Sequence, residues 1–63
     1  MMSVYRIIKF KATPSDADEE QVETFYGLPD RPKDLSVWEN RKQLEQEGFT
    51  DIEFVSSEIG QPD

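Results

Sequence analysis

The amino-acid sequence predicts an α+β fold in which one helix lies on one face of a three-stranded antiparallel sheet. Three segments rich in β-branched and aromatic residues, at 4–11, 21–26 and 49–57, are typical of strands. One helix, with a start and a stop signal, is predicted between the second and the third of them. The order is therefore ββαβ, and a right-handed connection from the second strand to the third favours the sheet order 2-1-3. The 63 residues allow one small domain, which we expect to span residues 1–58.

The first strand, from Val4 to Lys11, is the clearest of the three because it contains neither glycine nor proline. The polar residues that follow it predict an acidic loop over 12–20. A short helical turn after Pro14, capped by Ser15 or Asp16, is the alternative for this segment.

The second strand, at 21–26, ends where a proline-rich turn is predicted over 27–34. Gly27 precedes Pro29 and Pro32 in this stretch. Proline has no backbone N–H to donate to a neighbouring strand and its ring fixes φ, so a central strand is excluded here. The turn therefore separates the predicted hairpin from the helix.

The helix is predicted to begin at about Val37 and to end at about Glu47. Ser36 and Glu39 match a capping box, in which each side chain accepts a hydrogen bond from an exposed backbone N–H at the helix start. Asp34 is the alternative cap, and it would lengthen the helix at this end.

One sequence pattern marks both the end of the helix and the start of the last strand. Gly48 stands where a helix needs a left-handed residue, and Phe49 is placed to pack on Leu44, as in a Schellman ending. Residues 49–57 then alternate in the manner of a half-buried strand. We expect residues 59–63 to form a flexible tail.

Strand alternation sorts the apolar side chains into two sets, of which a single helix can cover only one. The set predicted to form the core consists of Val4, Ile8, Phe10, Val22, Tyr26, Ile52 and Phe54, together with Trp38 and Leu44 from the helix. The set predicted to lie on the uncovered face consists of Tyr5, Ile7, Phe25 and Val55. An exposed apolar cluster of this kind indicates an interface. A lid formed by the acidic loop, the proline-rich turn or the tail is the alternative.

The sequence contains no histidine and no cysteine, which excludes the commonest catalytic and metal-binding chemistry. A Ser–His or Cys–His pair, a disulfide and an ordinary zinc site all need at least one of these residues. A calcium loop starting at Asp16 would need glycine and glutamate where Gln21 and Gly27 stand. We therefore predict no catalytic residue, no cofactor, no metal site and no enzymatic activity.

Fourteen acidic residues against seven basic ones give a formal net charge of −7. This charge disfavours direct binding to nucleic acid or to an anionic membrane, both of which attract basic proteins. It favours a protein partner with a basic surface, which the field of the whole molecule would attract from a distance. No apolar run approaches the length of a signal-peptide core or a membrane span, so a cytoplasmic location is expected.

The acidic side chains are concentrated after the first strand, where they predict a partner-binding site. The residues expected to contact the partner are Tyr5, Ile7, Asp16, Asp18, Glu19, Glu20, Glu23, Phe25 and Val55. The acids would accelerate association, and the aromatic side chains would slow dissociation. The alternative is a solvated loop whose charge is compensated by Arg6, Lys9 and Lys11 of the first strand.

In size, acidity and hairpin–helix–strand order, the chain resembles the small inhibitor proteins that bacteriophages make against host enzymes. The resemblance concerns architecture and assigns no residue a role. It implies a non-enzymatic inhibitor or modulator that docks on a basic surface of a nucleic-acid-handling enzyme. A structural homodimer or assembly module, formed through the uncovered sheet face or through the second or third strand as an edge, is the alternative. A divalent-metal-binding protein or a small enzyme is a remote alternative.

Overall fold

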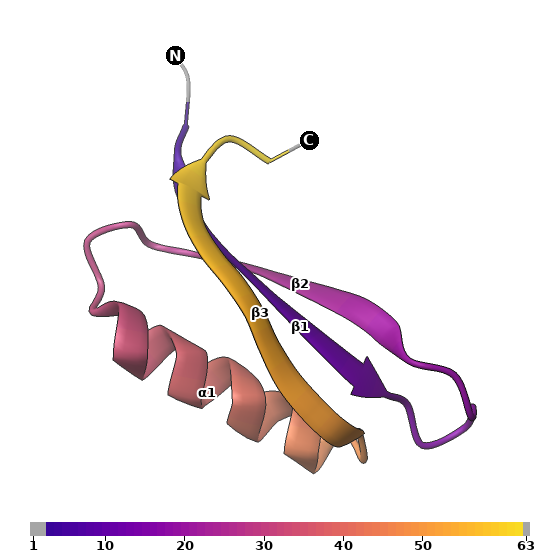
Figure 1. The fold of residues 1–63 in the computed structure, drawn as a ribbon. Coiled ribbons are helices and arrows are strands. Elements are labelled where there is room, and N and C mark those ends of the chain that lie inside the picture. The colour runs from indigo at the N-terminus through magenta and orange to yellow at the C-terminus, as the bar shows by residue number, and fades with distance from the viewer. Residues whose placement is uncertain (1–2, 63) are drawn as a thin grey trace.

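Within residues 3–62, three antiparallel strands and one helix follow one another in the order ββαβ, as the sequence predicts. The computed structural model describes residues 3–62. Its elements are β1 (Tyr5–Thr13), β2 (Gln21–Gly27), α1 (Lys33–Gln46) and β3 (Thr50–Gly60). The sheet order is β2-β1-β3, and Figure 1 shows α1 on one side of the strands, running alongside β3. No helix within residues 3–62 is long and apolar enough to cross a membrane.

The two strand pairs differ in regularity. The β1–β2 register runs without interruption from the Arg6–Gly27 pair to the Ala12–Gln21 pair. The β1–β3 register shifts twice, so that β3 carries extra residues. At the first shift Phe10 faces Phe54 while Lys9 faces Ser56, which leaves Val55 as the extra residue of a β-bulge. The second shift coincides with a left-handed backbone at Asp51, where φ is 52°.

The helix begins one turn earlier than predicted. Pro32 is its N-cap residue, and no side chain caps the helix start. The backbone N–H of Ser36 donates to the carbonyl of Pro32 at 3.1 Å, so Ser36 already lies inside the helix, where it is buried. The predicted capping box is therefore wrong. Glu39, which was expected to complete the box, forms a 2.9 Å ion pair with Arg31 instead.

The helix ends in the predicted Schellman motif. The N–H of Phe49 donates to the carbonyl of Leu44 at 3.0 Å, and the N–H of Gly48 donates to the carbonyl of Glu45 at 3.1 Å. Gly48 has a φ of 92°, in the region that disfavours residues with a Cβ atom. Two carbonyls at the helix end thus gain partners, and the chain reverses directly into β3.

We expect Gly48→Ala to lower the free energy of unfolding by about 1–2 kcal/mol, because a Cβ atom is strained at positive φ. The added carbon would also lie 3.1 Å from Cβ of Ser15, closer than an ordinary contact. Gly60→Ala is the control, since a Cβ atom there meets nothing within 4 Å. Urea denaturation of the three proteins measures the difference. Equal midpoints for the two variants would contradict this account of the turn.

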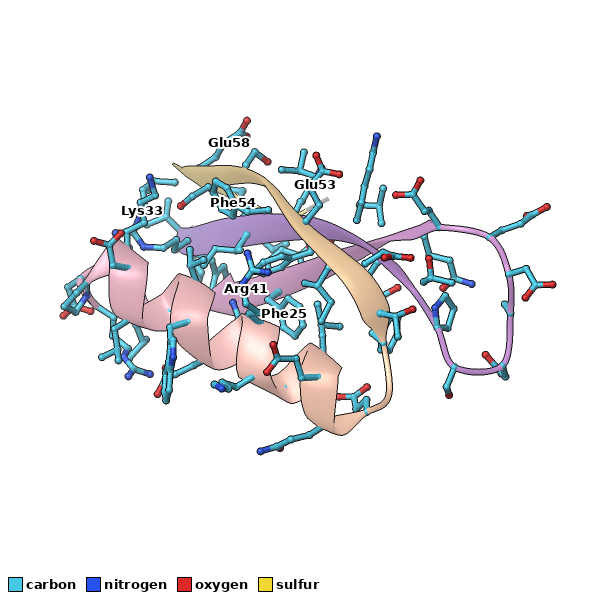
Figure 2. The ribbon with its side chains drawn as sticks, turned by 60° about the horizontal axis from the view of Figure 1, so that its bottom comes forward. Phe25, Lys33, Arg41, Glu53, Phe54 and Glu58 are labelled. Atoms are coloured by element: carbon cyan, nitrogen blue, oxygen red, sulfur yellow. The ribbon has the colours of Figure 1, made fainter. Side chains whose placement is uncertain are left out.

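The core lies between α1 and the central strand. Its fully buried members are Ile8, Phe10 and Ala12 from β1 and Leu44 from α1. Partly buried side chains surround them: Phe25, Val37, Phe49, Ile52 and Phe54. The ring of Phe10 meets the rings of Phe25 and Phe54 edge to face, at centroid distances of 6.1 and 5.9 Å. The Arg41 guanidinium lies 5.5 Å from the Phe10 centroid, and in Figure 2 Arg41 and Phe25 lie between the helix and the sheet.

The side of β2 that points toward the helix is the opposite of the one predicted. Phe25 was expected on the uncovered face, but it stands opposite Ile8 and packs on Phe10. Val22 and Tyr26 were expected in the core, but they are 57% and 51% exposed. The cause is the hairpin register, because residues directly opposite each other on paired strands point to the same side of the sheet.

Two further side chains predicted for the core are exposed. Trp38 is 57% exposed, on the side of the helix away from Leu44, with the ammonium of Lys42 located 5.8 Å from its ring. Val4 precedes the first paired residue of β1 and is also exposed. The indole N–H of Trp38 needs water or a polar partner, and this outward position gives it access to solvent.

The last strand continues further than predicted. Ile59 and Gly60 pair with Arg6 and Tyr5, so the residues expected to begin a tail belong to β3. The end of β3 is held in the sheet by pairing with the start of β1, and the sequence pattern of residues 57–60 does not reveal this pairing. Residue 63, the last of the predicted tail, lies outside the described residues.

Candidate interaction surface

The sheet has one face that the helix does not cover, and we call it the open face. Strand alternation and register assign to it Tyr5, Ile7, Lys9 and Lys11 of β1, Val22, Thr24 and Tyr26 of β2, and Glu53, Ser56 and Glu58 of β3. Figure 2 shows Glu53 and Glu58 projecting away from the helix, on the side of the sheet opposite to Arg41. Of the site residues predicted for this face, Tyr5 and Ile7 lie on it. Val55, also predicted there, is the exposed extra residue of the bulge.

Three apolar side chains gather at one end of the open face, and we call this group the aromatic end: Tyr5, Ile7 and Tyr26. The rings of Tyr5 and Tyr26 meet edge to face, with centroids 6.1 Å apart and planes at 75°. Ile7 stands directly opposite Tyr26 in the β1–β2 register. Tyr5 and Ile7 are partly buried, whereas Tyr26 is 51% exposed. The group therefore forms a defined apolar surface that is open to solvent.

The middle of the open face is basic. Lys9 lies between Thr24 and Ser56, and Lys11 lies between Val22 and Glu53, on the two neighbouring strands. Both lysines are exposed. Of the three basic residues named as compensating the acidic loop, Lys9 and Lys11 stand on this face between the loop and the aromatic end, whereas Arg6 lies on the helix side.

The acidic loop connects β1 to β2 and comprises residues 14–20, because Ala12 and Thr13, predicted as its first residues, belong to β1. Its first residues form a turn in which the N–H of Ala17 donates to the carbonyl of Pro14 at 3.3 Å. The loop lies at the end of β1 far from Tyr5, and Figure 1 shows it at the opposite end of the sheet from the β2–α1 connection. At about 3.3 Å per residue, the length of β1 separates the aromatic end from the loop by about 25 Å.

The predicted partner-binding residues thus fall into separate places. Asp16, Asp18, Glu19 and Glu20 are exposed on the acidic loop. Glu23 stands opposite Phe10 and therefore points to the helix side of the sheet, as Phe25 does. One copy of the protein does not bring the acids and the aromatic end into a single continuous patch.

The prediction missed Val22 and Tyr26 as surface residues, and it missed the structural role of Arg6. The Arg6 guanidinium donates to the carbonyls of Pro29 and Arg31 at 3.2 and 3.3 Å and to the Ser57 hydroxyl at 3.4 Å. It therefore ties the β2–α1 connection to the sheet. The available signal was position, because Arg6 is two residues from Ile8 and four from Phe10, and side chains at this spacing along a strand point to the same face.

A second exposed apolar surface lies on the outer side of α1, where Leu35 and Trp38 are three residues apart and both exposed. The ion pair between Arg31 and Glu39 borders this part of the helix. These residues face away from the sheet, so they do not extend the open face.

Within residues 3–62 the structure contains no pocket and no group of three acidic side chains placed to hold a metal ion. The chain was also compared with protein-family models, with curated proteins and with solved structures. None of them matches it.

Proposed function

We propose that this protein is a non-enzymatic binding module that docks on a basic surface of another protein and acts as an inhibitor or modulator of a nucleic-acid-handling enzyme. The observation that carries the proposal is the aromatic end. Its two tyrosines and Ile7 stand on the face of the sheet that the helix leaves uncovered. Apolar groups of this kind on a soluble domain are typical of interfaces.

The aromatic end supplies the apolar contact of the complex. Tyrosine is enriched among the residues that dominate binding energy, because it buries a large rigid ring and keeps a hydroxyl for hydrogen bonding. The edge-to-face packing of Tyr5 and Tyr26 restrains both rings before binding, which lowers the entropy lost on docking. Loss of one ring should therefore act mainly on the dissociation rate.

The net charge of −7 selects the partner. A groove that binds nucleic acid is lined by lysine and arginine, which neutralise phosphates, and the same groove attracts an acidic protein. The exposed loop acids contribute to that attraction and act on the association rate. Occupation of the groove by this protein would block nucleic acid, so inhibition needs no chemical step.

The test is a purified two-component complex, with the partner first identified by capture on the immobilised protein. We expect the triple variant Asp18→Asn, Glu19→Gln, Glu20→Gln to slow association about tenfold at low salt. We expect Tyr5→Ser to speed dissociation about thirtyfold, the effect of a central interface aromatic. Trp38→Ser, which removes an exposed ring from the helix, is the control and should change neither rate. Stopped-flow or surface-based kinetics measure both rates.

Two results would overturn the proposal. Association that does not depend on salt would exclude a basic partner, because screening weakens attraction between exposed charges. A complex weakened by Trp38→Ser and unaffected by Tyr5→Ser would move the interface from the open face to the helix.

A further inference from the structure

We propose that β2 pairs with β2 of a second copy of the chain, antiparallel and centred on Thr24, to give one continuous sheet of three strands from each copy. Both β2 and β3 are edges of the three-stranded sheet, and an edge presents unpaired backbone N–H and carbonyl groups. The two edges differ in the regularity of their pairing and in the charge that they carry.

The β2 edge is regular and its open-face side chains are uncharged. Its register with β1 has no shift, and Gln21–Gly27 contains neither proline nor lysine, two of the residues that commonly protect an edge. Val22, Thr24 and Tyr26 are all exposed. The helix lies alongside β3, so it does not cover this edge (Figure 1).

The β3 edge is protected. Two register shifts interrupt it, one at the Val55 bulge and one beside Asp51, and bulges twist an edge away from further pairing. It also carries Asp51, Glu53 and Glu58 and no basic residue. A second copy of β3 would meet like charges there, so the second copy is assigned to β2.

The sequence of β2 is complementary to itself about Thr24. In the antiparallel register, Val22 stands opposite Tyr26 of the second copy, Thr24 stands opposite its own equivalent, and Tyr26 stands opposite Val22 of the second copy. β-Branched–aromatic and Thr–Thr pairs are both favourable across antiparallel strands. Glu23, the one charge of β2, faces Phe25 of the second copy, so the two carboxylates are not directly opposite each other.

This arrangement brings together the acidic loop and the aromatic end, which are separated in a single copy. Gln21 stands opposite Gly27 of the second copy, so the acidic loop of one copy, which ends at Glu20, lies next to the Tyr26 end of the other. Acids and aromatic side chains that are about 25 Å apart within one chain then adjoin across the seam. This consequence rests on the proposed function, whereas the dimer itself does not.

Salt separates the dimer from the docking reaction. Each copy carries −7, so the two copies repel each other and screening should strengthen their association. Docking of the same charge on a basic partner should weaken under the same conditions. Failure of one proposal therefore leaves the other measurable.

The experiment is light scattering on a sizing column at about 0.1 M and about 1 M salt, between which the Debye length falls from about 10 Å to about 3 Å. We expect the wild type to reach twice the monomer mass of 7.3 kDa at high salt. Thr24→Glu should remain at 7.3 kDa because it places two carboxylates opposite each other at the centre of the seam. Ser56→Glu is the matched control, since Ser56 and Thr24 flank the same Lys9 on opposite edges, and it should still dimerise.

A wild type that stays monomeric at both salts overturns the proposal. So does a Thr24→Glu variant that still dimerises, or a Ser56→Glu variant that is also monomeric, because neither result locates the seam at β2. Circular dichroism checks that each variant is folded. If Thr24→Glu is not folded, Val22→Glu tests the same seam with the same expected result. Val22 lies on the same β2 edge and stands opposite Lys11 of β1.

Discussion

Phe10→Ala should remove between about a third and all of the free energy of unfolding. Phe10 is fully buried in the central strand and touches the rings of Phe25 and Phe54. Removing a buried phenylalanine costs about 3–5 kcal/mol. A chain of 63 residues has a total stability of about 3–9 kcal/mol, at about 0.05–0.15 kcal/mol per residue. The loss is therefore comparable with the whole. Circular dichroism with a urea titration measures the folded fraction.

Trp38→Ala is the control for Phe10→Ala, because it removes a larger aromatic ring from a site that is 57% exposed. Its expected cost is about 1 kcal/mol or less, since an exposed side chain loses little buried area. A Trp38 variant as unstable as the Phe10 variant would contradict the placement of Trp38 on the outer side of the helix.

Leu44→Ala should have the second largest effect, about 2–5 kcal/mol in the free energy of unfolding. Leu44 is the fully buried apolar residue of α1 within the described chain, and it is 1% exposed. Its carbonyl also accepts the hydrogen bond from Phe49 that closes the helix. The variant should lose helical signal at a lower urea concentration than the wild type, because the anchor between helix and sheet is gone.

Leu35→Ala provides the comparison within the same helix and with the same chemical change. Leu35 is 41% exposed on the outer side, so its truncation should cost about 1 kcal/mol or less. If both leucine variants unfold at the same urea concentration, the assignment of the two faces of α1 is wrong.

The architecture could be predicted from the sequence because several local signals agree. The β-branched run of β1, the prolines after Gly27 and the glycine at position 48 each specify a different boundary. The Schellman ending was predictable to the individual hydrogen bond, because its glycine and its apolar contact stand at fixed offsets from the helix end.

The helix start was not predictable from its capping pattern. Ser36 and Glu39 have the correct spacing, but Pro32 starts the helix one turn earlier and places Ser36 inside it. The spacing of two residues in a short motif does not determine whether they lie in the first or the second turn of the helix. The fixed φ of proline, which suits the start of a helix, was the competing signal.

The facing of β2 was not predictable from its own sequence. Val22 and Tyr26 on one side and Phe25 on the other give nearly equal apolar content, so the alternation does not identify the buried side. The hairpin register determines which side of β2 is buried, and a shift of one residue in that register would bury the other side. In β3 the bulge at Val55 reverses the alternation midway, and pairing with the start of β1 continues the strand to Gly60.

The candidate site was predictable in its parts but not in its assembly. Tyr5 and Ile7 lie on the open face as expected, and the loop acids are exposed. Their separation follows from the hairpin itself, since the loop joins the strands at the end far from Tyr5. A strand of nine residues separates Tyr5 from the acidic loop, and the composition of the two segments does not reveal this distance.

The irregular β3 edge limits how far the sheet can grow. A strand pairing that is symmetric about Thr24 uses the regular β2 edge of both copies at once, and the edges left at the two outer ends are the bulged, acidic β3 strands. Addition of a third copy would require one of these edges to accept a strand. The proposed dimer would therefore be closed at two copies, and the Val55 bulge and the register shift beside Asp51 would protect the protein against open-ended fibre formation.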